Sequence, residues 1–287
     1  MELLEYYKKH GIMTEITSQK SMVDRLPQTV EGIVKIVQNI ILHEHWVGHY
    51  GVELDDKKRK EPWIRSVNDK LIHLREKGFT HVSDRLDHQS KIIGICRDFT
   101  LLAVSLCREV GIPARARCGF VTYFEKGKYI DHWLLEYWNY DTQKWTYVDA
   151  QLDPIQQKIL KIDFNPLDVN EALFLTGPKA WELCRSGQVE AELFGIYQWW
   201  GYDYIVGNLL LDANALLKLP LQPWDGWDGY KNLPISKWTL KDYKIIDTLS
   251  KLVNKVDDDF NALYNYINIH DTLKVPNDLS RVTNYLK

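Results

Sequence analysis

Residues 94–113, with the sequence GICRDFTLLAVSLCREVGIP, decide the fold of this chain. Apolar residues in this stretch recur at the three- and four-residue spacing of one helix face: Phe99, Leu102, Ala103, Leu106 and Val110. Gly111 followed by Pro113 is a typical helix stop. The stretch therefore predicts a helix that begins near Cys96 and packs one apolar face against the rest of the protein.

Three strands are predicted directly after this helix. Residues 114–124 alternate in the manner of a strand, residues 125–128 form a turn signal, and residues 130–138 and 145–149 form two more strands that a polar loop joins. A helix followed by antiparallel strands is typical of an α+β domain rather than of βαβ units. We therefore predict an α+β fold in which the helix packs on an antiparallel sheet.

The flanking segments predict helical extensions of this core. Apolar residues recur at helical spacing near both ends of the chain: Val34, Val37, Ile40 and Ile41, and Leu249, Leu252, Val253, Val256 and Phe260. A Trp-rich stretch without clear periodicity, residues 194–227, lies before the late helix. We expect a single domain over residues 1–287, with a helical part at 1–84, the core at 85–155 and a Trp-rich, partly helical part at 156–287.

The composition is that of an ordinary globular protein. The 287 residues include 36 Lys and Arg against 39 Asp and Glu, with a net charge of −3, and 45% are hydrophobic. This near-neutral balance gives no electrostatic reason to bind nucleic acid or an anionic membrane. No run reaches the roughly 18 apolar residues of a membrane-spanning helix, and the acidic start lacks the apolar stretch of a secretory signal. We expect a cytoplasmic protein with no nucleic-acid or membrane partner.

The four cysteines, at positions 96, 107, 118 and 184, form no C-x-x-C pair. In a chain without an export signal they are expected to be free thiols rather than disulfides or zinc ligands. Cys96 differs from the others because the start of a helix offers N–H groups and a partial positive charge that stabilise a thiolate. A small buried hydrophobic residue would also explain Cys96, so its position alone does not make it a nucleophile.

His132 and Asp149 lie on the two strands of the predicted hairpin. Its loop is centred near residue 141 or 142, and this register pairs position 134 with 149 and leaves His132 diagonal to Asp149. A carboxylate diagonal to an imidazole on one sheet face can orient it through a hydrogen bond. Because the imidazole would then deprotonate Cys96, the spacing predicts a Cys-His-Asp triad.

The core of the chain resembles the transglutaminase-like superfamily in four segments, in this order: residues 94–99, 102–115, 131–133 and 145–149. The resemblance implies a papain-like α+β fold in which Cys96 is the nucleophile, His132 the base and acid, and Asp149 the residue that orients the imidazole. It covers about residues 85–155. The flanks resemble a bacterial subgroup of the superfamily for which no reaction is established.

Two departures from the family narrow what the resemblance implies. The chain has no acidic cluster like the calcium sites of the animal transglutaminases, and no cysteine zinc site like that of the peptide N-glycanases. Both activities are therefore disfavoured. The family chemistry implies no cofactor and no metal, and its substrate would be a peptide, an amide or another acyl compound. Neither the acceptor, water or an amine, nor the oligomeric state is indicated.

Acyl transfer also needs a second oxyanion donor, because the backbone N–H of Cys96 supplies only one. Gln89, seven residues before Cys96, has a side-chain amide that could serve, and Trp63 could serve through its indole N–H. For both residues a surface or core position is the alternative. Asp98 could bind substrate, or it could form a salt bridge with Arg97 that fixes the helix start.

Several other residues have two interpretations. Arg115 and Arg117 share a strand face, where they either bind a carboxylate or phosphate or face solvent. Trp133 is expected to point away from the preceding histidine, into the core. Four residues of the Trp-rich part would shape specificity if that part folds over the cleft, and would otherwise be structural: Asn208, Asp212, Trp224 and Asp225.

His45 and His49 are four residues apart and would share a helical face, as zinc ligands do. No third ligand is evident nearby, so we expect no metal site. The sequence predicts a cysteine-dependent acyl-transfer enzyme, either a hydrolase or a transferase. The alternatives are a catalytically silent binding or scaffold module on the same fold and, with less support, a metal-dependent hydrolase at His45 and His49.

Overall fold

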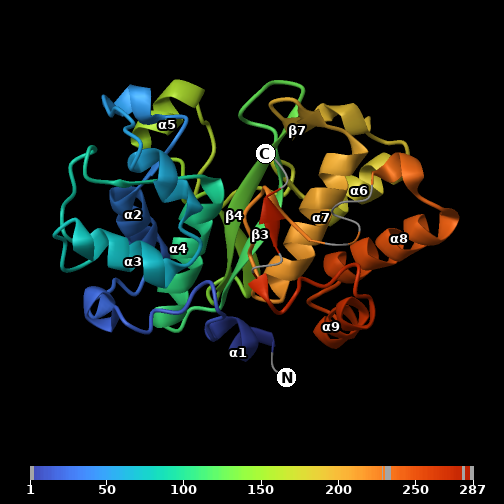
Figure 1. The fold of residues 1–287 in the computed structure, drawn as a ribbon, viewed down its shortest axis with the longest axis horizontal. Coiled ribbons are helices and arrows are strands. Elements are labelled where there is room, and N and C mark those ends of the chain that lie inside the picture. The colour runs from blue at the N-terminus through green and yellow to red at the C-terminus, as the bar shows by residue number, and fades with distance from the viewer. Residues whose placement is uncertain (1–2, 228, 230–233, 280–281, 285–287) are drawn as a thin grey trace. The chain divides into compact units, whose positions relative to one another are not determined.

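The contacts of the computed structural model divide the chain into two compact units, which are described separately (Figure 1). Unit 1 comprises Met1–Ala116 and Trp133–Val169, and unit 2 comprises Arg117–His132 and Asn170–Lys287. The structure describes residues 3–227, 229, 234–279 and 282–284. The expectation of a single domain in three parts stays a prediction.

Unit 1 is built around a buried helix, α4 (Cys96–Glu109), in which every residue from 96 to 108 is buried. Its bounds confirm the predicted helix, and Gly111 follows it with a φ of 78°, a conformation that favours glycine. Three helices of this unit contact α4: α1 (Leu3–Lys8), α2 (Val30–Ile40) and α3 (Val67–Glu76). The remaining helices of unit 1 are α5 (Pro154–Leu160) and the 3-10 turns η1 (Lys20–Val23), η2 (Val47–Tyr50) and η3 (Lys58–Trp63).

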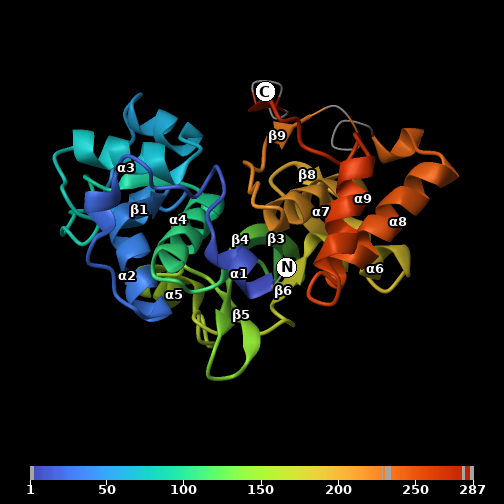
Figure 2. The same cartoon turned by 90° about the horizontal axis from the view of Figure 1, so that it is seen from below.

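A short parallel pair leads into α4. β1 (Ile41–His43) pairs with β2 (Ile92–Gly94) in the register Ile41↔Ile92 and His43↔Gly94, and α4 lies beside β1 (Figure 2). The sequence analysis did not predict this pair, because strands of three residues are too short to show a two-residue alternation. β2 ends two residues before Cys96, so the pair places the start of α4.

The predicted hairpin is present. In unit 1, residues of β4 (Tyr129–Asn139) pair antiparallel with β5 (Lys144–Val148), from Asn139↔Lys144 to Leu135↔Val148. This confirms the predicted register, since the same alignment continued by one step pairs 134 with 149. The helix packs on this hairpin as predicted, because the Thr100 hydroxyl donates to the Trp133 carbonyl oxygen at 2.9 Å. Trp133 is 1% exposed, which confirms its core position.

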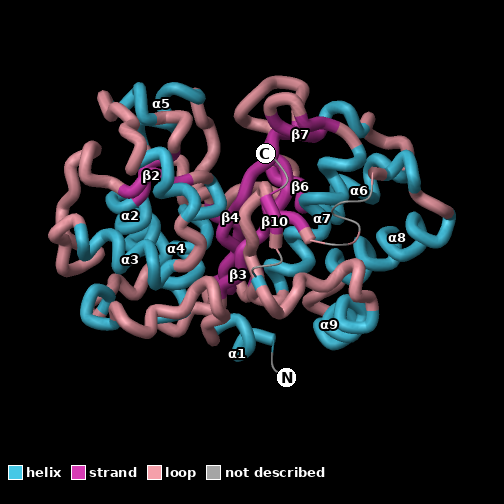
Figure 3. The backbone as a smooth tube through the Cα atoms, viewed as in Figure 1, coloured by secondary structure: helices cyan, strands magenta, loops and turns pink. Residues whose placement is uncertain are grey.

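Unit 2 contains a mixed sheet, drawn in magenta in Figure 3. Its strand order is β6-β3-β4-β7-β8, in which β6 (Phe174–Thr176) pairs antiparallel with β3 (Ala114–Val121), and β7 (Phe194–Ile196) pairs antiparallel with β8 (Trp199–Trp200). β4 and β7 run parallel, which the predicted all-antiparallel sheet did not include. The α+β class is confirmed, and the sheet is mixed.

The helices of unit 2 are α6 (Gly177–Arg185), α7 (Tyr202–Leu216), α8 (Leu240–Asn254) and α9 (Phe260–Ile269). The short elements are η4 (Ala191–Leu193), η5 (Ile235–Lys237), and the antiparallel strands β9 (Asp225–Gly226) and β10 (Thr283–Asn284). α6 and α7 lie side by side (Figure 1), so closely that a Cβ on Gly177 would stand 2.5 Å from the backbone of Asn208.

Two parts of the C-terminal prediction are wrong in detail. The single late helix is two helices, because α8 ends at Asn254 and α9 begins at Phe260. The stretch predicted as irregular, residues 194–227, contains α7. Residues 205–216 of α7 are all buried, so apolar residues occur all around the helix and no single face repeats. Within the described part of the chain, no helix combines the length and hydropathy needed to cross a bilayer.

Candidate functional site

Cys96 is the first residue of α4 and is only 9% exposed. The turn from β2 into the helix is held at Ile95, whose N–H donates to Asp98 Oδ2 at 3.0 Å and whose carbonyl accepts from the Asp98 N–H at 2.8 Å. This reciprocal pair fixes the backbone on either side of Cys96. The N–H groups and the positive end of the helix dipole are therefore held next to the sulfur.

A buried charge cluster underlies this turn. Asp98 Oδ1 lies 3.2 Å from Lys70 Nζ and 3.2 Å from Arg97 Nη1, and Arg97 also donates to the Arg65 carbonyl oxygen at 2.7 Å. The side chains of Asp98, Arg97 and Lys70 are at most 2% exposed. Burial lowers the pKa of Lys70, although Asp98 acts in the opposite direction. Of the two interpretations of Asp98, the structure shows the salt bridge that fixes the helix start.

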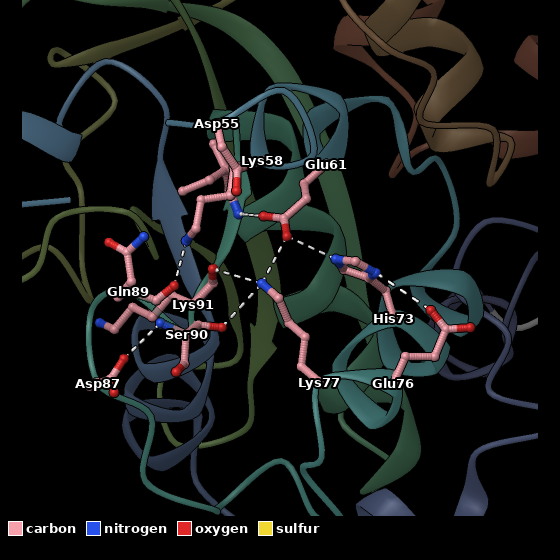
Figure 4. Close-up of polar contacts among 11 residues, drawn as sticks. Asp55, Lys58, Glu61, His73, Glu76, Lys77, Asp87, Gln89, Ser90 and Lys91 are labelled. Atoms are coloured by element: carbon pink, nitrogen blue, oxygen red, sulfur yellow. Dashed lines mark hydrogen bonds and ion pairs between the residues drawn. The ribbon is translucent and has the colours of Figure 1, made fainter. Parts of the chain in front are cut away.

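A second buried carboxylate, that of Glu61, holds β2 (Figure 4). Glu61, 3% exposed, accepts from the Ile93 N–H through Oε2 at 2.6 Å. Its Oε1 accepts from His73 Nε2 and Lys77 Nζ, both at 2.8 Å. Lys77 also donates to the carbonyl oxygens of Ser90 and Lys91. The cluster therefore anchors the strand that ends just before Cys96.

The four described cysteines are thiols, as predicted, and none of them is joined in a disulfide. Burial raises the pKa of Cys107 to about 12 and the pKa of Cys184 to about 11. Cys118 is also fully buried, on β3 in unit 2. Cys96 alone of the four begins a helix, and this is the position expected of a reactive cysteine.

Asp149 follows β5 in unit 1 and is fully buried. Its N–H donates to the Pro166 carbonyl oxygen at 2.8 Å, and its Oδ1 accepts from the Gln151 N–H at 3.0 Å. The next residue, Ala150, accepts from the Gln38 side chain of α2 at 3.2 Å. These contacts fix the segment that holds the carboxylate.

His132 lies in the part of β4 that belongs to unit 2 and is 1% exposed. The Phe124 ring meets the imidazole edge-on at a centroid distance of 4.8 Å, and the Tyr123 ring does so at 6.3 Å. The neighbouring Asp131 accepts from Asn208 Nδ2 at 2.6 Å. The imidazole is thus enclosed by aromatic rings, on a strand that α7 holds in place.

The two candidates for the second oxyanion donor lie on different elements of unit 1. Gln89 is exposed, and its backbone carbonyl oxygen accepts from Lys58 Nζ (Figure 4). Trp63 ends η3 and is 46% exposed. The oxyanion role of each residue stays a prediction.

The expected helical face for His45 and His49 is wrong. β1 ends at His43, residues 44–46 form a turn, and a single 3-10 turn follows at Val47–Tyr50. The two histidines therefore do not repeat at α-helical spacing. Among the described residues, no group of three or more His, Cys, Asp or Glu side chains is arranged to hold a metal ion.

Both strand arginines are buried, so the solvent-facing interpretation is wrong. Arg115 pairs with Glu136 and lies over the Trp145 ring at 3.9 Å, all within unit 1. Within unit 2, Arg117 donates through Nε and Nη2 to the carboxylate of Asp212, at 2.9 and 2.8 Å. Each arginine therefore pairs with a carboxylate of this chain. The contact of Arg117 with Asp212 has the bidentate geometry that guanidinium groups favour.

In the Trp-rich part, Asp225 is fully buried and its Oδ2 accepts from the Gln222 N–H at 2.9 Å. Trp224 directly precedes it, at the start of the short pair that β9 forms with β10. Both residues lie in unit 2, and their role in specificity stays a prediction. Asp212 and Asn208 are held by the structural contacts given above.

Sequence reasoning did not single out the buried charged residues Glu61, Lys70 and Glu136, and it did not pair Asp212 with Arg117. None stands near a partner in the sequence, so no local pattern marks them. The available signal was indirect, because charged residues inside strongly apolar segments, such as Arg115 in β3, require buried partners of opposite charge.

Comparison with known proteins agrees with the resemblance of the core. Residues 59–150 match the profile of the family described as the Transglutaminase-like superfamily. No curated protein matches the chain. Among solved structures, the crystal structure of "a Putative Cysteine Protease from Cytophaga hutchinsonii" matches at 17% identity and a TM-score of 0.33, covering 53% of this chain and 43% of that one.

Proposed function

We propose that this chain, whose residues 59–150 match the profile of the transglutaminase-like superfamily, is a cysteine-dependent acyl-transfer enzyme that uses Cys96, His132 and Asp149 as its triad. The observation that carries the proposal is the placement of Cys96. It is the first residue of a buried helix, and a reciprocal hydrogen-bond pair between Ile95 and Asp98 holds its backbone. The confirmed hairpin register supports the assignment of Asp149 and His132.

In the proposed reaction, His132 takes the proton of Cys96, and the thiolate attacks the carbonyl carbon of an amide. A C–S bond forms, and N–H groups at the helix start hold the oxyanion. The C–N bond then breaks as the imidazolium gives its proton to the leaving amine. Water or a second amine attacks the thioester, loses a proton to His132, and releases Cys96. Asp149 orients the imidazole throughout.

Selective alkylation tests this proposal without a known substrate. Treated with sub-stoichiometric iodoacetamide at acidic pH, Cys96 is expected to label at least about tenfold faster than each other cysteine, because an imidazolium stabilises its thiolate. Cys107 and Cys184 remain protonated, since burial raises the pKa of both. Peptide mass spectrometry locates the label.

Two variants serve as controls. In His132→Ala the preferential labelling of Cys96 at acidic pH is expected to disappear. In His10→Ala, which changes a histidine just after α1 in unit 1, this preference is expected to remain. Cys96→Ser removes the label. If Cys96 reacts no faster than the buried cysteines, both with iodoacetamide and with a small disulfide probe, the enzyme proposal is refuted and a binding module remains.

A further inference from the structure

The carboxyl ends of β1 and β2 meet at one edge of their parallel pair. His43 pairs with Gly94, and the Glu44 N–H extends the pairing with a 2.9 Å bond to the Gly94 carbonyl oxygen. Cys96 follows Gly94 by two residues. The same register continued by one step places Glu44 opposite Ile95, the residue before Cys96, so Glu44 occupies a position from which it can meet a molecule that reaches Cys96.

The Glu44 carboxylate is partly closed to water and lies near a second carboxylate, that of Asp98. The Glu44 side chain is 31% exposed, and burial is the largest cause that raises its pKa. His45, 3.4 Å away, lowers the pKa, and the smaller effect of the negative charge of Asp98 raises it. The neighbouring cations of α3 and α4, Lys70 and Arg97, are directed to Asp98. An added positive charge beside Glu44 would therefore be stabilised.

We propose that Glu44 forms a subsite for a positively charged group, an ammonium or guanidinium, on the substrate that acylates Cys96. The inference rests on the proposed function of Cys96 and assigns its substrate class. The preferred substrates are amides or peptides with a basic group close to the attacked carbonyl. His45, which is 53% exposed, lies 3.4 Å from the same carboxylate, so a basic group of the substrate would bind beside this imidazole.

Charged thiol reagents measure this preference directly. Cys96 is modified at about pH 8 with methyl methanethiosulfonate and with its cationic trimethylammonium-ethyl and anionic sulfonatoethyl relatives, and the rates are normalised to those of free cysteine. The cationic reagent is expected to react faster than the anionic one. Glu44→Gln is expected to lower the ratio of the cationic to the anionic reaction rate by about threefold to tenfold. The reason is that the Glu44 charge is partly shielded from water and therefore interacts more strongly with a charged reagent.

Three comparisons decide the outcome. Glu53→Gln removes an exposed carboxylate of the same unit and is expected to leave the ratio unchanged. In the unmodified protein, rising salt is expected to reduce the ratio, a test that needs no variant. A ratio that is insensitive to both salt and Glu44→Gln, with the neutral reagent still reacting at Cys96, refutes the subsite alone. Failure of the neutral reagent to react at Cys96 refutes the proposed function together with the subsite.

Discussion

Replacing Asp98 by alanine is expected to lower the free energy of unfolding by about 3–5 kcal/mol. The carboxylate is fully buried, where it pairs with Lys70 and Arg97 and accepts from the Ile95 N–H. Its loss would remove the carboxylate from two buried cations and from one buried N–H group. Because water does not reach them, the lost interactions would not be replaced.

Urea denaturation of the purified protein measures this difference. Asp56→Ala, at an exposed aspartate of the same unit, is expected to change stability by less than about 0.5 kcal/mol. Adding Lys70→Met to Asp98→Ala is expected to restore part of the loss, because the second substitution removes one of the buried charges. If Asp98→Ala unfolds at the same urea concentration as Asp56→Ala, the cluster does not stabilise the helix start.

Replacing Glu61 by glutamine is expected to cost about 2–4 kcal/mol and to slow alkylation of Cys96. The amide cannot accept hydrogen bonds from Ile93, His73 and Lys77 together, because an NH2 donor replaces one of the two carboxylate oxygens. Loss of the Ile93 contact would free one side of β2, the strand that ends two residues before Cys96. Urea denaturation gives the stability, and iodoacetamide labelling gives the reactivity.

The cost of Glu61→Gln is expected to depend on pH. Burial raises the pKa of Glu61, but the hydrogen bonds from Ile93, Lys77 and His73 outweigh it and hold the pKa below its ordinary value of 4.5. A carboxylate with a lowered folded-state pKa stabilises the protein above the unfolded value, and this contribution is lost as the pH falls through the folded-state pKa. The difference between the two proteins should therefore shrink below about pH 4.5. Glu53→Gln, at an exposed site, should show no such trend.

The hairpin shows how far local patterns reach. A polar loop between two alternating segments predicted a pairing centred at residue 141 or 142, and the structure has Asn139↔Lys144 and Leu135↔Val148. The prediction succeeded because the length of the loop that joins the two strands of a hairpin defines their register. The prediction that Asp149 lies diagonal to His132 rests on this register.

Local patterns failed where contacts join distant parts of the chain. Glu61 and Ile93 are far apart in the sequence, and so are Arg117 and Asp212, yet each pair forms a buried contact. Helix α7 was not predicted, because complete burial removes the polar face that makes a helix visible in a sequence. The parallel pair of β1 and β2 was missed because its strands are short.

The sequence by itself determined the helix that begins at Cys96, the strands after it and the hairpin register, because each follows from spacing along a few neighbouring residues. Only the tertiary structure decided which charges are buried together. The partners of Asp98, Glu61 and Arg115 come from separate elements, and their pairing depends on which surfaces exclude water after the chain has folded. The same holds for Glu44, whose place beside Gly94 arises from the β1–β2 pairing.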